Sequence, residues 1–486
     1  MRRLLLWTAS AGLTLSGTIV TVLLVRAAML TPMPRPEGEP LPFAFDELGA
    51  PVRLAAALGV LGEGEEGPGL AAVLEAGFPL LHAALHRETR AAGNLLYEWP
   101  GSDAALPPVV LSARLDGGPV RTVSLPVAPA GTIDGGFIHG RGARGGTGSA
   151  LALLESVEGL LSAGFAPRRT VIIILGRVRP EGTGAPERTA AEILGERGIR
   201  PAWVLADGLF LISGFFPGIR DPVGAVAVAG KREMNLRLTA RSEPGSASLP
   251  PRRSAAGILG EAVGRLDGVF APALMEPNLE LVRTLGARAD PGTRLLAANL
   301  WLFARPFARA LTERPLLNAS LRTTVVVDSI GPSAPDGVLS RELSARVRLA
   351  LAPWNEPAAA VEELRERLVD LPLTVESAGD PLPATAGSTS SSGSMSAANA
   401  AGGFRAIRAA IHLVFPDVAA VVPAVTPLPG RIADFRALAG EVYGFAPFRM
   451  DEEALLALPG SLDRVRTGVY TAAVRFYAEL IARSAG

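Results

Sequence analysis

Cysteine is absent from this chain, and histidine occurs only four times. The missing thiols exclude disulfides, cysteine nucleophiles and thiolate metal sites, and they are compatible with either side of a membrane. The charges balance at 47 basic and 47 acidic side chains, so no basic excess indicates nucleic acid as a partner. The chain is nevertheless long and apolar, because 486 residues, 48% of them hydrophobic, suffice for one large core or two.

The N-terminus carries a long uncharged run, Leu4 to Val25. At about 1.5 Å per residue, a helix of this length spans the roughly 30 Å hydrocarbon core of a bilayer. Arg2 and Arg3 precede the run and Arg26 follows it, which predicts a cytoplasmic N-terminus and an extracytoplasmic main domain. A cleaved signal peptide is the alternative, but the run is longer than usual and lacks a clean cleavage site. We therefore expect a single-pass membrane protein.

Alternating strand and helix patterns follow this run and a proline-rich segment. Short apolar runs of the buried-strand type occupy residues 109–113, 170–175, 203–206 and 223–229. Helical segments separate them, and residues 149–165 show the helical period clearly. This order is typical of an α/β domain.

The order of predicted strands and helices changes after residue 230. A strand, helix, strand, strand, helix and strand are predicted at 234–240, 254–266, 321–328, 342–351, 357–369 and 373–377. Apolar residues alternate with polar ones along 342–351, so one face of that strand should be buried. A long insertion before the second strand contains Trp301, Leu302, Phe303 and Phe307, whose bulk suggests packing.

Composition divides the chain further. A tract at 384–403 is dominated by Ser, Ala, Gly and Thr and should be flexible. We expect a cytoplasmic tip and membrane helix at 1–30, a stiff proline-rich stalk at 31–42, a first domain at 43–229 and 404–486, and an insertion at 230–383.

Five motifs carry a resemblance to a known family. They lie at Ser112–Pro119, Gly140–Gly145, Leu175–Pro180, Trp203–Gly208 and Phe445–Gly460. In order and spacing the chain resembles the dinuclear zinc aminoacylase and Gly-Xaa carboxypeptidase family, most closely its N-acyl amino acid hydrolase branch. The resemblance implies a mixed-sheet, zinc-exopeptidase-like α/β domain with an inserted ferredoxin-like α+β domain that serves as lid and dimerisation surface.

The residues that the resemblance assigns to the metal centre are not ligands here. Arg114, Gly145, Pro180, Ala206 and Pro459 stand at the ligand positions, and Arg179 stands at the position of the general base. A guanidinium has five donors and no lone pair for a metal. The acidic residues retained nearby are Asp116 and Asp207. We therefore expect no metal, no cofactor and no catalytic residue.

Other sites are poorly supported. His82 and His86 are four residues apart on an expected helix, which would put them on one face, but no glutamate motif accompanies them. The stretch Gly140–Gly145 matches a dinucleotide fingerprint, yet no ribose-binding acid follows at the proper place. It should instead expose backbone N–H groups toward the old metal centre. The serine-rich tract offers no base for a hydrolase.

Two functional classes remain. The first is a catalytically silent homologue that binds an anionic ligand or a partner. The second is an active metallohydrolase that cleaves N-acyl amino acids or dipeptides with unconventional ligands, and zinc belongs only to this alternative. A candidate anion pocket consists of Arg114, Arg144, Arg177 and Arg179. A structural salt-bridge cluster of these arginines with the retained aspartates is its alternative. Expected partners are the membrane, a small anion and a second copy bound through the insertion, but no nucleic acid.

Overall fold

The computed structural model describes most of the chain. The exceptions are residues 1, 63–67, 91–92, 117–127, 179–185, 247, 332–338, 378–401, 428–431, 433, 452–453 and 455–462, together with the side chains of 2–13, 68, 116, 177–178, 186–190 and 434. The tract predicted to be flexible, 384–403, lies outside the described residues up to position 401.

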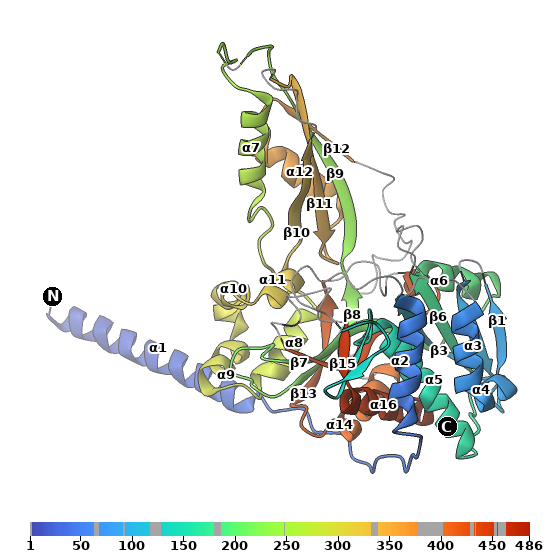
Figure 1. Cartoon of the computed structure of the whole chain (residues 1–486). Coiled ribbons are helices and arrows are strands. Elements are labelled where there is room, and N and C mark those ends of the chain that lie inside the picture. The colour runs from blue at the N-terminus through green and yellow to red at the C-terminus, as the bar shows by residue number, and fades with distance from the viewer. Residues whose placement is uncertain are drawn as a thin grey trace.

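A large mixed sheet forms the centre of the first domain (Figure 1). Its order is β1 (His86–Thr89), β2 (Leu95–Trp99), β6 (Val171–Val178), β3 (Val109–Asp116), β7 (Trp203–Ser213), β14 (Val442–Asp451), β8 (Val223–Gly230) and β13 (Ala420–Thr426). Strands β6, β3, β7 and β14 run parallel to one another. The predicted α/β class is confirmed, and the chain returns to this sheet after the second domain.

Helices cover the sheet. They are α2 (Gly49–Gly62), α3 (Pro68–Gly77), α4 (Pro79–Ala84), α5 (Gly146–Ser162), α6 (Pro186–Glu196), α14 (Gly402–Val414), the short η2 (Asp434–Ala437) and α16 (Thr467–Ala485). Helices α5, α14 and α16 pack together, with α5 against β3 and α16 against β14. A small sheet of β15 (Arg464–Arg466), β5 (Phe137–His139) and β4 (Ile133–Asp134) lies beside α2.

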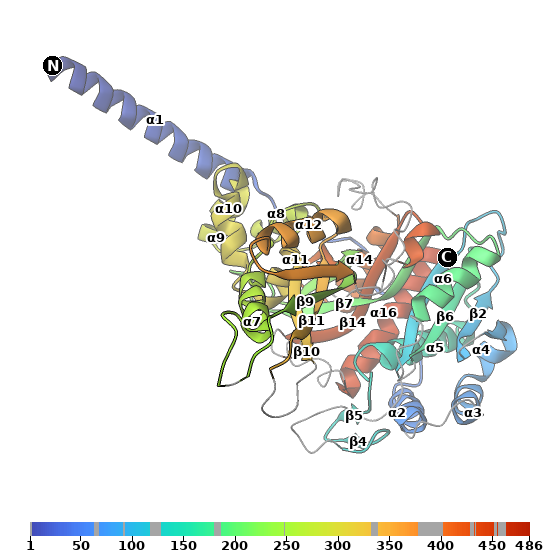
Figure 2. The same ribbon diagram turned by 90° about the horizontal axis from the view of Figure 1, so that it is seen from above.

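The second domain has its own sheet and core. Its elements are β9 (Arg232–Arg241), α7 (Ala255–Leu266), β10 (Thr324–Gly331), β11 (Glu342–Leu351), α12 (Pro357–Arg367) and β12 (Leu373–Ser377). The sheet is antiparallel in the order β10-β11-β9-β12, the ferredoxin-like arrangement. The predicted alternation along β11 is confirmed, because Ala345, Val347 and Leu349 are buried between exposed neighbours. The domain rises above the large sheet (Figure 1) and, seen from above, lies on the side of α9 and α10 (Figure 2).

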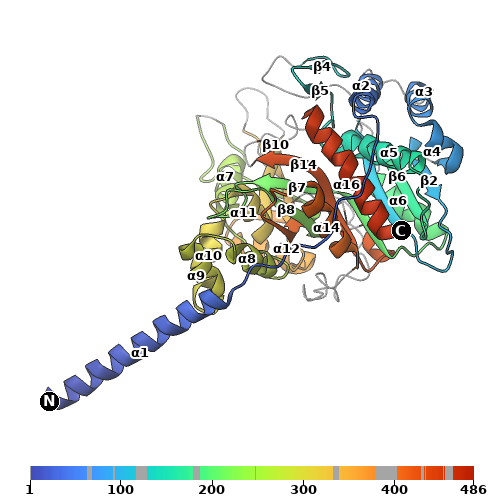
Figure 3. The ribbon, with the colours of Figure 1, turned by 90° about the horizontal axis from the view of Figure 1, so that it is seen from below.

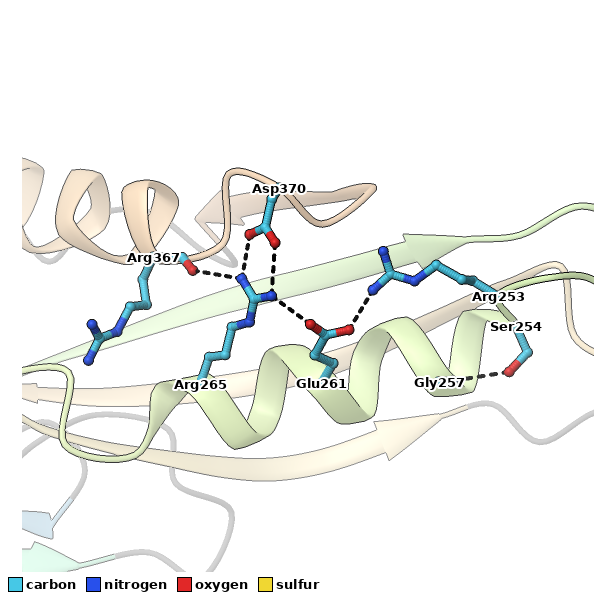
Figure 4. Close-up of polar contacts among 7 residues, drawn as sticks. All are labelled: Arg253, Ser254, Gly257, Glu261, Arg265, Arg367 and Asp370. Carbon is cyan, nitrogen blue, oxygen red and sulfur yellow. Dashed lines mark hydrogen bonds and ion pairs between the residues drawn. The ribbon is translucent and has the colours of Figure 1, made fainter.

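A surface network ties α7 to the segment after α12 (Figure 4). Arg265 donates to both carboxylate oxygens of Asp370 and to Glu261, which also accepts from Arg253. The hydroxyl of Ser254 accepts from the backbone N–H of Gly257 at 3.1 Å and begins α7. These charged groups are solvent-accessible, so they orient the two helices more than they stabilise the domain.

Four helices between α7 and β10 pack on the first domain rather than on the second. They are α8 (Asn278–Gly286), α9 (Pro291–Ala298), α10 (Leu300–Leu311) and α11 (Pro315–Leu321). Leu281, Leu285 and Phe307 belong to the large core, and the Phe307 ring meets Phe216 edge-on at 6.4 Å. The segment 230–383, predicted as one insertion, therefore contributes to two cores.

The N-terminal helix α1 (Arg2–Met29) projects from the molecule beside α9 and α10 (Figure 3). It contains the predicted apolar span, Leu4 to Val25, whose side chains up to residue 13 lie outside the described part. Over the described residues, no helix is both long enough and apolar enough to cross a membrane.

The segment 31–42 is not the free stalk that its prolines predict. Arg35 donates to the carbonyl oxygens of Pro416 at 3.1 Å and Val418 at 3.2 Å. The backbone N–H of Leu41 donates to Glu479 at 2.7 Å. These bonds hold the segment against the first domain, because proline stiffness does not prevent the intervening polar groups from finding partners there.

Lys231, the single lysine of the chain, lies where β8 leads into β9. Its side chain is fully buried, and its Nζ donates to the hydroxyl of Thr324, at the start of β10, at 3.1 Å. The bond therefore joins two of the strands that connect the domains. Burial, together with a smaller effect of repulsion from the nearby Arg322, lowers the pKa of Lys231 to about 7.

This buried lysine predicts a specific pH dependence. The folded pKa of about 7 lies below the ordinary value of 10.5, so the unfolded chain binds more protons between these values. The free energy of unfolding should therefore rise with pH across this window, by at most about 1.4 kcal/mol per pH unit. The variant Lys231→Met has no titratable group at this position, so its free energy of unfolding lacks this rise with pH. Urea unfolding from pH 6 to pH 10 should show the stability advantage of the variant shrinking as pH rises; an advantage independent of pH would contradict the assignment.

Candidate functional site

The candidate site lies at the ends of neighbouring parallel strands. In the pairing of β3 with β6, Arg114 is opposite Gly176, and Leu115 is opposite Arg177. In the pairing of β3 with β7, Ser112 is opposite Ala206. The register thus brings the first, third and fourth motifs to one edge of the sheet, as their resemblance implies. Arg114 and Arg177 occupy register positions one residue apart.

Arg114 lies against the retained aspartate of β7. The backbone N–H of Arg114 donates to Oδ2 of Asp207 at 3.0 Å, and its guanidinium Nε lies 3.9 Å from the same oxygen. The Asp207 side chain is 3% exposed and that of Arg114 19% exposed. A buried carboxylate is costly without a compensating charge and hydrogen bonds. The interpretation of the arginines as partners in a structural salt bridge therefore applies to Arg114 and Asp207.

Strand β7 does not end after Ala206, contrary to the predicted run 203–206. It continues to Ser213 and pairs with β14, where Leu209 is opposite Phe445. Gly208 makes this possible, because a Cβ on it would lie 2.2 Å from the carbonyl carbon of Gly444. The two backbones can approach this closely only without side chains.

The glycine-rich turn before α5 is tightly bonded. Gly145 caps the helix with φ of +107°, a conformation that L side chains rarely adopt. The backbone N–H of Gly148 donates to the carbonyl oxygen of Gly142 at 3.0 Å, and that of Ser149 donates to Gly145 at 3.1 Å. These two N–H groups are therefore used within the turn and are not offered to a ligand. For the rest of the turn, the exposure of N–H groups to a ligand stays a prediction.

Aromatic side chains, which the sequence analysis did not single out, surround this turn. A Cβ on Gly145 would lie 3.7 Å from the ring of Phe210, and a Cβ on Gly148 would lie 3.2 Å from the ring of Phe448. Both rings are buried, at 2% and 0% exposure. The long apolar runs of β7 and β14 were the available signal. The turn is thus bordered by apolar side chains, whereas a metal centre needs polar donor side chains.

A tyrosine completes the polar group around Asp207. Burial raises the pKa of Tyr477 far above its ordinary range, and the nearby Asp207 carboxylate raises it further. Tyr477 therefore stays a neutral hydroxyl at any physiological pH. Its position in α16, far along the sequence, gave no signal of this role.

Arg144 belongs to a different group of residues. Its guanidinium donates to the Met450 sulfur at 3.5 Å. Burial lowers the pKa of Arg144, and repulsion from Arg464 and Arg466 contributes. Those two arginines lie over the ring of Phe137, at 4.9 and 4.5 Å from its centroid. The small sheet thus surrounds Arg144 with other arginines, a neighbourhood that the four-arginine prediction did not include.

Several predicted positions cannot be placed. Arg179, Pro180 and Pro459 lie outside the described residues. For Arg177 and Asp116 only the backbone is described, in β6 and β3. Convergence of Arg177 and Arg179 on Arg114 therefore stays a prediction.

The four histidines are separate. Helix α4 ends at Ala84, so His82 and His86 do not share the helix that the sequence predicts, and His86 begins β1. His82 bonds the Phe78 carbonyl oxygen at 2.8 Å. His139 lies in β5, and His412 lies in α14, where burial lowers its pKa to about 4. Among the residues described, no three His, Asp or Glu side chains group as metal ligands would.

At the positions that the resemblance assigns to metal ligands, the described side chains do not fit zinc. Zinc takes thiolate, imidazole or carboxylate donors, and three of them are usual in a catalytic site. Arg114 provides only N–H donors, Gly145 no side chain and Ala206 only a methyl group. A carboxylate could not be restored at position 145 without strain, because its φ is +107°.

Comparison with known proteins supports the resemblance. The chain matches no family model. It is 28% identical to Probable carboxypeptidase S-like 2 of Dictyostelium discoideum over 410 residues, which cover 83% of this chain and 77% of that protein. It is 28% identical to the N-fatty-acyl-amino acid synthase/hydrolase PM20D1 of Homo sapiens over 392 residues, 79% of this chain and 76% of that protein.

Solved structures share the fold. An M20 family metallo-carboxypeptidase from Sulfolobus solfataricus has a TM-score of 0.57 at 13% identity, covering 90% of this chain and 99% of its own. Human carnosine dipeptidase 1 has a TM-score of 0.54 at 13% identity, covering 89% of this chain and 94% of its own. At such identities the likeness concerns architecture and not chemistry.

The contact between Arg114 and Asp207 predicts a double-mutant cycle. Arg114→Leu leaves a buried carboxylate without its adjacent cation and should lower the free energy of unfolding by about 1–3 kcal/mol. Asp207→Asn removes the charge, so the double variant Arg114→Leu/Asp207→Asn should be more stable than the sum of the two single changes predicts. Arg168→Ala, which removes an exposed ion pair with Asp103, is the control and should have little effect. Additive effects in the cycle would show that the pair does not interact.

Proposed function

Because the chain is a homologue of the carboxypeptidase S-like proteins and the N-fatty-acyl-amino acid synthase/hydrolases, with the fold of the M20 metallo-carboxypeptidases, we propose that it is a membrane-attached relative without hydrolytic chemistry that binds an anionic ligand. The contact between Arg114 and Asp207 is the observation that carries this proposal. It puts a guanidinium beside the retained carboxylate, at the strand end where the resemblance expects a metal ligand.

The electrostatics of this edge favour a bound anion over a bound cation. The Arg114 side chain retains 19% exposure although it adjoins Asp207. Arg177 follows at the end of β6, and Arg179 comes two residues later in the sequence. Guanidinium groups bind carboxylate and phosphate bidentately, and they repel metal ions. A second carboxylate or phosphate is the complementary ligand.

The relatives suggest what carries that anion. The name N-fatty-acyl-amino acid synthase/hydrolase describes an enzyme that acts on molecules in which a fatty acyl chain is joined to an amino acid and its carboxylate. In this chain the end of β3 provides the guanidinium of Arg114 for such a carboxylate. We therefore propose an N-acyl amino acid, or a molecule of the same chemistry, bound without cleavage.

The first test is metal content and hydrolysis. The full chain, purified in detergent, should contain no stoichiometric zinc by elemental analysis and should not hydrolyse N-lauroylglycine. Since structural zinc can contribute on the order of 10 kcal/mol to folding, an unchanged melting temperature in chelator is also expected. One or two zinc ions per chain, with hydrolysis that a chelator abolishes, would establish the active metallohydrolase instead.

The second test is anion binding. Calorimetry with N-lauroylglycine should show binding that weakens as salt is raised, because exposed charges are screened. Arg114→Gln should weaken this binding about tenfold or more, since a hydrogen bond to a charged group contributes about 1.5–3 kcal/mol. Arg168→Ala, far along the surface, is the matched control. Equal binding in both variants would place the ligand elsewhere, and no binding to the unaltered chain would refute the ligand class.

A further inference from the structure

Helix α1 leaves the domain as an apolar rod. All described side chains from Thr14 to Val22 are exposed, and Leu15, Val20 and Leu24 are 64%, 53% and 58% exposed. The apolar residues lie on every side of the helix and not on one stripe. A helix that is apolar all round belongs in a membrane or a core, whereas docking in a protein groove requires only one apolar face. The inference below rests on the proposed membrane attachment through this helix.

The end of α1 is fixed to α9 and to Asn299 by five hydrogen bonds. Arg294 donates to the carbonyl oxygens of Ala27 and Leu30 at 2.7 Å each and to that of Ala28 at 3.3 Å. The other two bonds run from Asn299 Nδ2 to the Leu23 carbonyl oxygen, at 3.0 Å, and from Arg26 Nε to the Ala298 carbonyl oxygen, at 3.2 Å. Asn299 Nδ2 also donates to Leu295 at 2.9 Å, which fixes this amide on α9. Since residues 31–42 are also held against the domain, no spacer separates the domain from α1.

These contacts fix the position along α1 at which the domain begins. From Leu4 to Leu23 an α-helix rises by about 29 Å, which matches the roughly 30 Å thickness of the hydrocarbon core. Asn299 therefore lies where α1 leaves the hydrocarbon. The indole Nε1 of Trp301 donates to Oδ1 of Asn299 at 3.3 Å, so Trp301 lies at the same level. Tryptophan is the residue enriched at this boundary, because its ring is apolar and its N–H is polar.

Helix α10 begins at this level with one face buried and one exposed. Phe307, Ala308 and Leu311 lie in the core. The opposite face consists of Trp301, Leu302, Arg305, Pro306, Arg309 and Ala310. Trp301 is 60% exposed and Leu302 is 47% exposed, so the packing that their bulk suggested applies to Phe307 and not to them.

The charges on this face complement an anionic surface. Arg305 and Arg309 line an open hollow of about 550 Å³ with Pro306, Ala310 and Glu313. Within the part of the chain that the structure describes, neither arginine forms an ion pair. Large apolar side chains followed by arginines along one face are typical of helices that lie in the headgroup layer. Each arginine near an anionic surface contributes about 1 kcal/mol, or roughly fivefold in binding.

We propose that the exposed face of α10 rests in the headgroup layer of the leaflet from which the end of α1 emerges, with Trp301 and Leu302 in the interface and Arg305 and Arg309 against anionic lipid. The occupant of this face is the bilayer itself. Together with the bonds between α1 and α9, this second contact holds the domain at a fixed tilt.

The absence of cysteine gives a clean experiment. Single cysteines are introduced into the full chain as Leu302→Cys, Leu15→Cys and Val369→Cys, and each is labelled with an environment-sensitive fluorophore. Val369, 82% exposed on the second domain, is the control for a surface away from the membrane. Each labelled protein is reconstituted into vesicles of phosphatidylcholine, with and without phosphatidylglycerol. Headgroup-located and chain-located lipid quenchers then report the depth of each label.

The label at position 302 should be quenched most by headgroup quenchers, that at 15 by chain quenchers, and that at 369 by neither. Quenching at 302 should increase with phosphatidylglycerol, and Arg305→Gln/Arg309→Gln should remove the increase. If 15 is quenched but 302 is as accessible as 369, the α10 contact is refuted while the anchor stands. If neither 15 nor 302 is quenched, the anchor and the contact both fail. Shielding of 302 that depends on protein concentration and not on lipid would assign this face to a second copy, which also overturns the proposal.

Discussion

The centre of the large sheet depends on the contact between Gly208 of β7 and Gly444 of β14. Any side chain on Gly208 would overlap the backbone of its neighbour, with a Cβ only 2.2 Å from the carbonyl carbon of Gly444. With both residues bare, β7 continues past Asp207 to Ser213 and pairs with β14 on both sides of Gly208, with two shifts of register. The orientation of Asp207 toward Arg114 and the placement of Phe210 beside the turn both follow from this continuous strand.

Charge compensation stabilises the buried carboxylate of Asp207 at the candidate site. Asp207 is buried, so its carboxylate needs a cation and hydrogen-bond donors. The backbone and guanidinium of Arg114 supply both, and the hydroxyl of Tyr477 stays neutral nearby. At the neighbouring turn, the φ of Gly145 would strain any side chain placed there, a carboxylate included. The described residues thus form a consistent site of their own, in which one arginine serves both stability and, in our proposal, ligand binding.

Two connections place the rest of the molecule relative to this sheet. Lys231 joins the strands that lead into the second domain, and Arg294 with Asn299 holds the end of α1 on α9. Both use buried or half-buried polar groups whose bonds have defined directions, unlike apolar packing. Polar bonds at these joints favour one arrangement of the bodies that they connect. The direction in which α1 leaves the domain, and hence the surface that would meet a membrane, follows from these few bonds.

The sequence by itself determined the α/β order and the ferredoxin-like element order, and it predicts that the residues at the expected ligand positions cannot hold a metal. Periodicity is a local property, and an arginine or glycine cannot coordinate zinc in any fold. The tertiary structure decided that residues 31–42 lie against the domain, that α8 to α11 join the first core, and that Arg144 neighbours Arg464 and Arg466. It also decided the length of β7. These features arise from pairings between residues far apart in the chain, which no local pattern encodes, because each depends on the shape and polar groups of a surface that exists only after folding.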